Sequence, residues 1–356
     1  MKKQNAITKQ HDPQTLAVMN DVMTQAGQAA NKAAANIAFD DHTARKANNT
    51  IRRKVADLAL FESFLRSAGV PASGLFDNPQ AWRGVTWGLV ETFKVWMLKQ
   101  SYAIASINGR LSTVRTYARI AAKAGAITAQ ESILIASVQG YANKEAKHID
   151  DKRRAEGMDT RKSNKKAEAV SIPEDIAQAL KQQADTPQGR RDTLIMCLLL
   201  DHGLRVGEIA ILSRAAFDLK AGTFTFYRPK VNKTQTHELT GDTRKAAIAY
   251  FRHDAPADGI LWRRSCKGTG KLSSPMSPIS ATRALTKRVE LLGRHAGIEG
   301  LSAHDARHYW ATFEARNNTP VDRLMDAGGW NSPAMPLRYI ESAHIANMGT
   351  AKVKAA

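Results

Sequence analysis

The sequence predicts a mostly α-helical protein of two domains, with a small antiparallel sheet in the second. Three observations lead to this prediction. The chain has 356 residues, enough for two ordinary domains, and 43% of them are hydrophobic, enough for packed cores. Apolar residues recur at helical spacing through the first half of the chain. One pair of segments rich in β-formers stands in the second half, with helical patterns on both sides.

The first part of the chain separates into an arm and a helical bundle. Residues 1–45 are rich in Ala, Gln and Asn, so we expect a flexible arm that is at most transiently helical. Residues 46–143 are predicted to form a helical bundle, in which Thr128 and Glu131 make the capping-box pattern of a fourth helix. The first three helices are indicated by apolar stripes: Ile51, Val55, Leu58 and Leu65; Trp82, Val85, Leu89, Phe93 and Met97; and Ile107, Leu111, Val114, Ala118 and Ala121.

The polar side of the third predicted helix carries hydroxyls between guanidiniums. Such a face fits a DNA major groove, where Arg110, Arg115 and Arg119 would be the contacts. An ordinary solvated helix face explains the same pattern equally well. The residues on this side are Arg110, Ser112, Thr113, Arg115, Thr116 and Arg119.

The charge of the chain indicates a polyanionic partner. Lysines and arginines number 52 against 33 acidic residues, a formal net charge of +19. Nucleic acid is the commonest such partner, although a solvated basic surface is the plain alternative. Residues 144–170 hold many of these cations and hardly a large apolar residue, so we expect a basic linker that could follow a phosphate backbone.

The cysteines and the lack of long apolar runs bear on the compartment. Cys197 lies in an apolar run and Cys266 in a basic segment, a pair that predicts no disulfide and a reducing environment. Residues 1–14 contain lysines but no apolar stretch follows them, and no run approaches the length of a membrane span. We therefore expect a cytoplasmic protein that does not enter membranes.

Residues 171–356 are predicted to form a mixed domain with a small sheet. A helix over 195–200 is followed by Gly203 as a plausible C-cap, and then by a helix over 206–212. Residues 223–227 and 236–240 are expected to pair as a hairpin, and helices resume near Ser280. The expected hairpin connection holds Pro229, Lys230, Asn232 and Lys233.

Two segments of this domain place cations where an anion could bind. Arg205 stands at a helix opening, where backbone N–H groups also favour an anion, although a plain ion pair with Glu208 at i, i+3 is the simpler interpretation. Farther on, a capping box places His304, Arg307 and His308 on one helix face. A zinc site at the two histidines competes with a phosphate site, but no third ligand is evident, so we expect no metal.

The last segment contributes an aromatic pair. A helix begins after Thr319-Pro320 and ends at Gly328-Gly329, Trp330 follows, and Ser332-Pro333 opens a short helix that carries Tyr339. A tyrosine beside aliphatic residues is by itself usually a half-buried core residue. The combination with the preceding cations changes its interpretation.

Together these motifs resemble the tyrosine recombinases, also called phage integrases. The resemblance covers roughly residues 50–345 and rests on four fragments: Arg205 within Gly-Leu-Arg-x-Gly-Glu, His304-x-x-Arg307-His308, Gly-Gly-Trp330 and Arg-Tyr339. It implies a SAM-like core-binding domain and a mixed α+β catalytic domain, which form a C-shaped clamp on DNA. It also implies a site-specific recombinase that needs no cofactor.

The resemblance implies roles for the site residues. Tyr339 would attack the scissile phosphate to give a 3′-phosphotyrosyl bond and a free 5′-hydroxyl. Arg205 and Arg307 would hold the non-bridging oxygens as planar, always-charged forks. His304 resembles the general base or phosphate ligand of the family, and His308 a supporting partner.

Three further roles follow from the same resemblance. Glu208 would orient Arg205. Trp330 stands where many members have histidine, and its indole N–H can donate a hydrogen bond but cannot exchange protons. The family places a proton-donating lysine in the β-hairpin, for which Lys233 is the first choice, while Lys230 is its rival and a candidate DNA contact.

Assembly and alternatives complete the expectations. Family members act as four protomers on two specific DNA sites, with DNA-bending or directionality proteins as possible accessories, and we expect a bacterial or phage protein that works at the nucleoid. The tail over 342–348 could dock on a neighbouring protomer. A type IB topoisomerase, which relaxes DNA as a monomer, and a DNA-binding regulator without catalysis are the alternatives.

Overall fold

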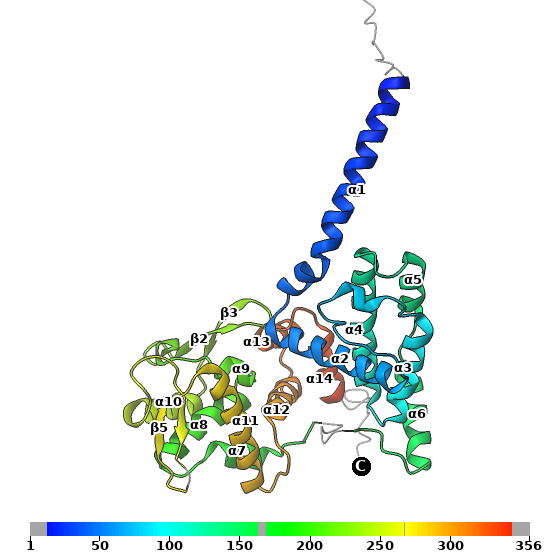
Figure 1. Ribbon diagram of the computed structural model, residues 1–356. Helices are drawn as coiled ribbons and strands as arrows, with labels where there is room; N and C mark the ends of the chain where they lie inside the picture. The colour runs from blue at the N-terminus through cyan, green and yellow to red at the C-terminus, as the bar shows by residue number, and fades with distance from the viewer. Residues whose placement is uncertain (1–12, 163–168, 267, 344–356) are drawn as a thin grey trace, which may run out of the picture. The chain divides into compact units, whose positions relative to one another are not determined.

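The computed structural model describes residues 13–162, 169–266 and 268–343. These residues are mostly helical, with two small antiparallel sheets, so the predicted fold class is confirmed (Figure 1). No helix in this part of the chain is long and apolar enough to cross a membrane. The tail expected to dock on a neighbour lies almost wholly outside the described residues.

The first unit is a helical bundle around an aromatic core. Phe61, Trp82 and Phe93 are fully buried at its centre, and the three predicted apolar stripes supply most of the core, although Val55 is exposed. The fourth helix begins as expected, because the Thr128 hydroxyl accepts a hydrogen bond from the Glu131 N–H. The elements are α1 (Pro13–Ala44), α2 (Asn48–Ser67), the 3-10 helix η1 (Pro79–Trp82), α3 (Trp87–Lys99), α4 (Ile104–Lys123), α5 (Ala129–Ser137) and α6 (Asn143–Ala155).

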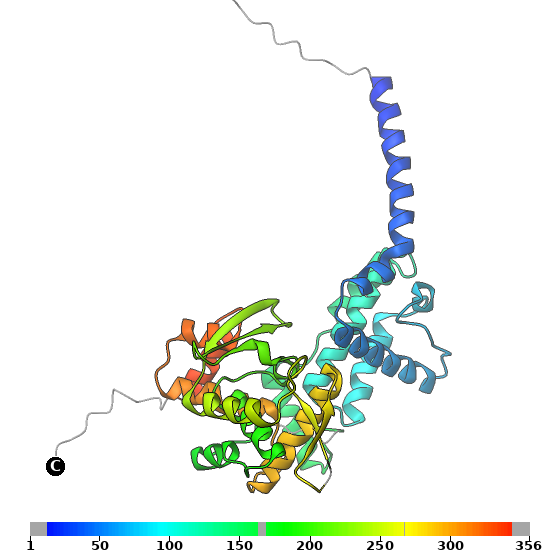
Figure 2. The same ribbon diagram turned by 90° about the vertical axis from the view of Figure 1, so that its left-hand side faces the viewer.

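Within the expected arm over residues 1–45, residues 13–44 form the helix α1. Alanine, which dominates the segment, has the highest helix propensity of all residues. Phe39 anchors the carboxyl end of α1, since it is buried and its ring packs edge-on against Tyr117 at 5.7 Å. From residue 21 to residue 34 the helix is exposed throughout, and it extends away from the rest of its unit (Figures 1 and 2).

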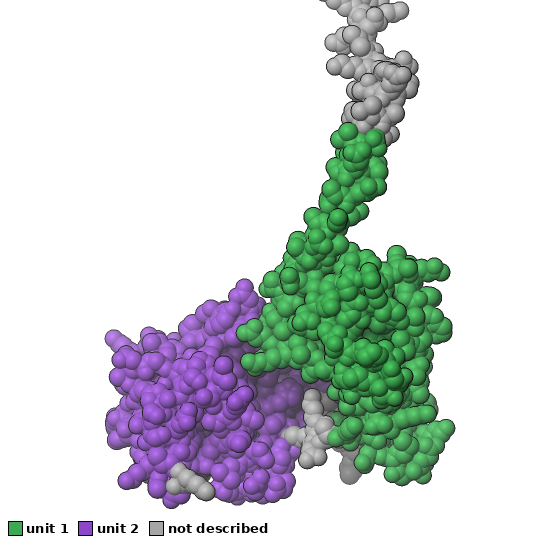
Figure 3. Space-filling model, in the orientation of Figure 1, with its two compact units in different colours: residues 1–165 green, residues 166–356 purple. Residues whose placement is uncertain are grey.

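The chain divides into two compact units, residues 1–165 and 166–356, within the expected linker (Figure 3). Contrary to expectation, the linker does not begin at residue 144, because α6 belongs to the first unit. Arg153 is buried and donates hydrogen bonds to the carbonyls of Tyr102 and Asp159. At least one cation of this basic segment therefore serves the fold of the bundle.

The second unit packs its helices around α8, in which residues 194–200 are all buried. Helices α7, α10 and α12 pack against α8. The elements are α7 (Glu174–Lys181), α8 (Pro187–Leu200), α9 (Val206–Ile209), the 3-10 helix η2 (Arg214–Ala216), β1 (Phe217–Asp218), β2 (Thr223–Arg228), β3 (Lys233–Glu238), α10 (Gly241–His253), β4 (Arg263–Ser265), β5 (Leu272–Pro275), α11 (Pro278–His295), α12 (Ala303–Arg316), α13 (Val321–Gly328) and α14 (Ala334–Ala343).

The β-hairpin is present, but its turn is tighter than predicted. Strands β1, β2 and β3 form an antiparallel sheet in this order, and Arg228 pairs with Lys233 at the turn. Asn232 adopts a positive φ of 50°, which lets the chain return within residues 229–232. Lys233 is therefore the first residue of β3 and not part of the connection. The small β4–β5 pair was not predicted, and α9 ends at Ile209 instead of Leu212.

We predict that Gly203→Ala destabilises the second unit by about 2–5 kcal/mol, because positive-φ strain adds to overpacking. Gly203 has a φ of +60°, and a Cβ there would lie 2.1 Å from the Trp310 ring. The control is Gly222→Ala, at a φ of +73° with open space around it, which carries the strain alone. Urea unfolding measures both variants, and equal losses would contradict the packing argument.

We also predict that the protein loses stability as the pH falls from 6.5 to about 4. Burial lowers the pKa of His202 from 6.5 to about 3, with His237 contributing, and lowers that of His237 to about 4, with Arg228 contributing. The unfolded chain therefore binds more protons in this window, and each histidine costs up to about 1.4 kcal/mol per pH unit. Urea unfolding at several pH values should show a smaller slope for His202→Gln, and an unchanged slope would refute the assignment.

Candidate active site

Helix α12 positions the central residues of the site. Its N-cap is Ser302, whose N–H and hydroxyl donate to the Asp305 carboxylate at 2.7 and 2.6 Å, so the predicted capping box is present. The second oxygen of Asp305 accepts from the Val170 N–H at 2.9 Å, which fixes the start of the helix against the incoming chain. His304 and Arg307 follow within the first turns of α12.

Arg307 is buried, and two backbone carbonyls hold its guanidinium. One Nη donates to the Gly203 oxygen and the other to the Gly328 oxygen, each at 2.5 Å. The guanidinium lies 4.6 Å from the centre of the Trp330 ring. Arg307 is therefore a guanidinium held by two backbone carbonyls beside an aromatic ring.

Arg205 lies at the N-cap of α9 and pairs with Glu208, as its i, i+3 spacing predicts. Its Nη1 donates to Glu208 Oε1 at 2.8 Å, and its backbone N–H donates to Oε2 at 2.8 Å. The Arg205 side chain is 25% exposed, whereas that of Glu208 is 2% exposed. The plain ion pair is thus present. The buried Glu208 carboxylate holds the partly exposed Arg205 guanidinium in a fixed direction.

Tyr339 lies on α14 among these groups and is 5% exposed. Its ring centre is 5.2 Å from that of His308 and 5.8 Å from that of Trp330. Burial raises the pKa of Tyr339, while the positive charges of Arg307 and Arg205 act to lower it. Burial and the two guanidiniums therefore act on the pKa of the phenol in opposite directions, and burial is the larger effect.

The two histidines of α12 contact each other. His304 Nε2 and His308 Nε2 are 3.2 Å apart, so one ring donates a hydrogen bond and the other accepts it. Burial lowers the pKa of both residues, and the neighbouring Arg307 charge adds to this effect. The structure describes no group of three or more His, Cys, Asp or Glu side chains that could hold a metal.

The site carries more buried positive than negative charge. Glu208 accepts from Arg205 and also, at 2.9 Å, from Arg228, a residue that sequence analysis did not select. Burial and the charges of Arg205 and Arg228 lower the pKa of Arg307 to about 9. One carboxylate thus faces three guanidiniums, and an anion with several oxygens would relieve their repulsion.

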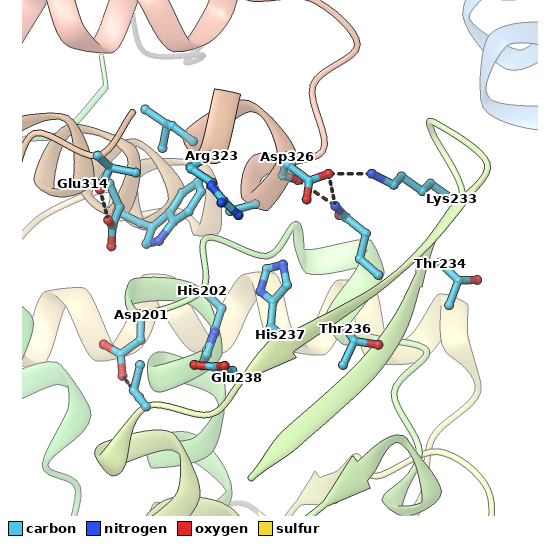
Figure 4. Close-up of a pocket in the computed structure, with 16 residues that line it drawn as sticks. Asp201, His202, Lys233, Thr234, Thr236, His237, Glu238, Glu314, Arg323 and Asp326 are labelled. Carbon is cyan, nitrogen blue, oxygen red and sulfur yellow. Dashed lines mark hydrogen bonds and ion pairs between the residues drawn. The ribbon is translucent and has the colours of Figure 1, made fainter. Parts of the chain in front are cut away.

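Lys233 is linked to this cluster through Asp326 and Gln235. Its Nζ donates to the Asp326 carboxylate at 2.5 Å, and this hydrogen bond lowers the pKa of Asp326 (Figure 4). Gln235 donates to the Asp326 carbonyl oxygen at 2.7 Å. Lys230, the rival candidate, lies in the turn between β2 and β3 and is exposed.

Beside Lys233, β3 and α13 line a pocket of about 670 Å³, which also contains His202 and His237 (Figure 4). Arg205, Arg307 and Tyr339 are not among the residues that line it. The pocket therefore adjoins the reactive groups but does not contain them.

The first unit presents only part of the polar face expected on α4. Arg119 and Ser112 are exposed, but Thr113 is buried and donates to Asp57 at 2.8 Å, which corrects its placement on that face. Arg110 stacks on a tyrosine ring and Arg115 donates to a backbone carbonyl. Both arginines thus have partners within the unit.

Two residues of the cluster escaped sequence analysis, Arg228 and Asp326. The signal for Arg228 was present, because β2 alternates and places Phe224, Phe226 and Arg228 on its buried face. An arginine at an inward position of a strand indicates a buried partner. Asp326 gave no such signal, since an acidic residue near a helix end is ordinary.

Comparison with known proteins covers the segment that holds these residues. Residues 171–344 match the phage integrase family. The integrase of Salmonella phage P22 is 40% identical over 67 residues, which cover 19% of this chain and 15% of that protein. The putative integrase/recombinase y4rF of Sinorhizobium fredii is 29% identical over 164 residues, 45% of this chain and 37% of the relative. The chain thus matches well under half the length of these curated relatives.

Solved structures share the fold. A lambda integrase dimer bound to a COC′ core site has a TM-score of 0.56 at 13% identity, covering 98% of this chain and 85% of that chain. The Tn1549 transposon integrase in complex with circular intermediate DNA also has a TM-score of 0.56 at 13% identity, covering 87% and 94%. Residues 171–344, just under half of the chain, therefore form a domain of the phage integrase family, the tyrosine recombinases, and the chain shares the fold of lambda integrase.

Proposed function

We propose that this protein is a site-specific DNA recombinase that cleaves and rejoins DNA through Tyr339. The observation that carries the proposal is that the Trp330 ring lies 5.8 Å from the Tyr339 ring and 4.6 Å from the Arg307 guanidinium, which in turn donates to the Gly203 oxygen two residues before Arg205. Family membership supports the same activity. The net charge of +19 supports double-stranded DNA as the partner.

The proposed reaction is an in-line displacement at phosphorus. The Tyr339 oxygen forms a bond to the phosphorus atom while the bond to the 5′-oxygen breaks, which leaves a 3′-phosphotyrosyl link. The phenolic proton passes to His304, paired with His308, and the leaving 5′-oxygen takes a proton from Lys233. Rejoining reverses these steps with the 5′-hydroxyl of the partner strand, so no external energy source is required.

The remaining groups stabilise the charge on the phosphate. Arg205 and Arg307 bind the non-bridging oxygens, and Trp330 contributes an indole N–H and the aromatic face beneath Arg307. Glu208 orients Arg205 through two hydrogen bonds. Removing one guanidinium should cost on the order of a hundredfold in rate.

We further propose how the whole protein acts. The bundle over residues 46–143 and the unit from residue 171 close as a C-shaped clamp round the duplex, with Arg119 and Lys230 among the contacts. Four protomers exchange strands between two specific sites, assisted by DNA-bending or directionality proteins, at the nucleoid of a bacterial host. Relaxation of any supercoiled plasmid by monomers would favour a topoisomerase activity instead.

We predict that Tyr339→Phe abolishes covalent attachment to DNA while duplex binding persists, because only the nucleophilic oxygen is removed. The measurement uses a library of nicked duplexes whose cleaved fragment diffuses away, followed by denaturing electrophoresis and peptide mass spectrometry. Tyr309→Phe, which changes a tyrosine of α12, is the matched control and should keep wild-type attachment. Attachment by Tyr339→Phe at the wild-type rate would refute the proposal.

We also predict that inorganic sulfate stabilises the protein more than chloride does at equal ionic strength. Sulfate would neutralise the excess of buried guanidiniums, and a concentration of 100 times its Kd would add about 2.7 kcal/mol. Thermal unfolding measures the difference, which Arg205→Met should remove and the exposed control Arg119→Met should retain. An equal sulfate effect in Arg205→Met would place the anion elsewhere.

A further inference from the structure

Arg228 is a fully buried cation beneath the proposed site. It ends the inward face of β2 with 0% of its surface exposed. Its Nη1 donates to Glu208 Oε2 at 2.9 Å, its Nη2 donates to the Ala327 oxygen at 2.6 Å, and its Nε donates to Gln235 Oε1. Three elements, α9, β3 and α13, thus meet at one guanidinium.

Burial of this charge opposes folding. Removing a guanidinium from water costs several kcal/mol, and its single carboxylate partner is shared with Arg205. An apolar side chain of similar volume would fill the space of Arg228 without that cost. The geometry therefore points to a purpose for the charge itself.

The contacts of Glu208 show what this charge can do. Its Oε2 accepts from both Arg228 and the Arg205 backbone N–H, while its Oε1 accepts from the Arg205 side chain. Arg228 therefore occupies one oxygen and fixes the plane of the carboxylate. Without Arg228, Oε2 would keep only the Arg205 backbone N–H and could accept a further hydrogen bond from the Arg205 guanidinium, so fewer N–H groups of that guanidinium would point at a phosphate.

The carboxyl end of α13 connects Arg228 to the other half of the site. Consecutive carbonyls of residues 326, 327 and 328 accept hydrogen bonds from Gln235, Arg228 and Arg307. These carbonyls lie at the helix end, where the dipole favours cations, and that of Asp326 also accepts from the Gly329 N–H at 2.9 Å. The next residue, Gly329, has a φ of +60°, and a Cβ there would lie 2.6 Å from Arg228 Cδ.

We propose that Arg228 is a positioning residue, which sets the plane of Glu208 and hence the aim of Arg205, and which holds the end of α13 so that Trp330 and Arg307 keep their places. This inference rests on the proposed recombinase function. Arg228 lies beneath the cluster and touches no reacting atom in this scheme.

The test compares Arg228→Met and Arg228→Lys with Arg191→Met in the full chain. Arg191 is a matched control, because it is also a buried arginine of the second unit, bound to Asp192 and Ser265 away from the proposed site. For each variant we measure the melting temperature, duplex affinity and the single-turnover rate of attachment to nicked duplex per folded molecule. Arg228→Lys keeps the charge and should fold even where Arg228→Met does not.

The proposal expects Arg228→Met to lose about tenfold to hundredfold in attachment rate, with duplex affinity nearly unchanged. Arg228→Lys should recover part of this loss, and Arg191→Met should lose stability alone. In the Glu208→Gln background, Arg228→Met should cost much less, because its route to Arg205 is already interrupted.

Three outcomes separate the possibilities. Wild-type rates in Arg228→Met and Arg228→Lys would overturn the positioning role, and losses that simply multiply with that of Glu208→Gln would overturn its route through Glu208. A rate loss per folded molecule in Arg191→Met equal to that in Arg228→Met would also overturn it, because loss of packing would then explain both. Failure of the wild-type protein to form any covalent adduct would instead overturn the proposed function.

Discussion

The hydrogen bonds of one buried carboxylate, that of Glu208, are the constraint on which the site depends. Glu208 accepts from the Arg205 side chain, the Arg205 backbone and Arg228, so it joins the start of α9 to the end of β2. Its burial removes competing water, which strengthens each of these bonds. The direction of the partly exposed Arg205 guanidinium is thereby determined by two buried groups, Glu208 and Arg228.

The end of α13 provides the matching constraint on the other side. A helix end normally leaves its last carbonyls to water, but here side chains of β2, β3 and α12 bind them. Arg307 spans from this end to the Gly203 carbonyl beside Arg205. Neighbouring backbone segments thus hold Arg205 and Arg307 in place, and the Trp330 ring lies against Arg307.

This arrangement trades stability for function. Burial of Arg307 and the neighbouring charges of Arg205 and Arg228 lower the pKa of Arg307, because its positive charge is poorly solvated and lies near two others. The hydrophobic interior around α8 must offset that cost. Under the proposed function the same imbalance favours a bound phosphate, so preorganisation for that phosphate and strain in the free protein would have one cause.

The sequence by itself determined the helical class, the starts of α5 and α12, and the family resemblance of the second unit, because periodicity, caps and motif spacing are local properties. Only the tertiary structure decided which cations serve the fold: Arg153 and Arg228 bind buried carbonyls or carboxylates, and α1 is a helix where composition predicted an arm. The sequence around a charged side chain does not reveal which group that side chain will bind. Its role is set by the acceptors that distant segments bring within about 3 Å of it.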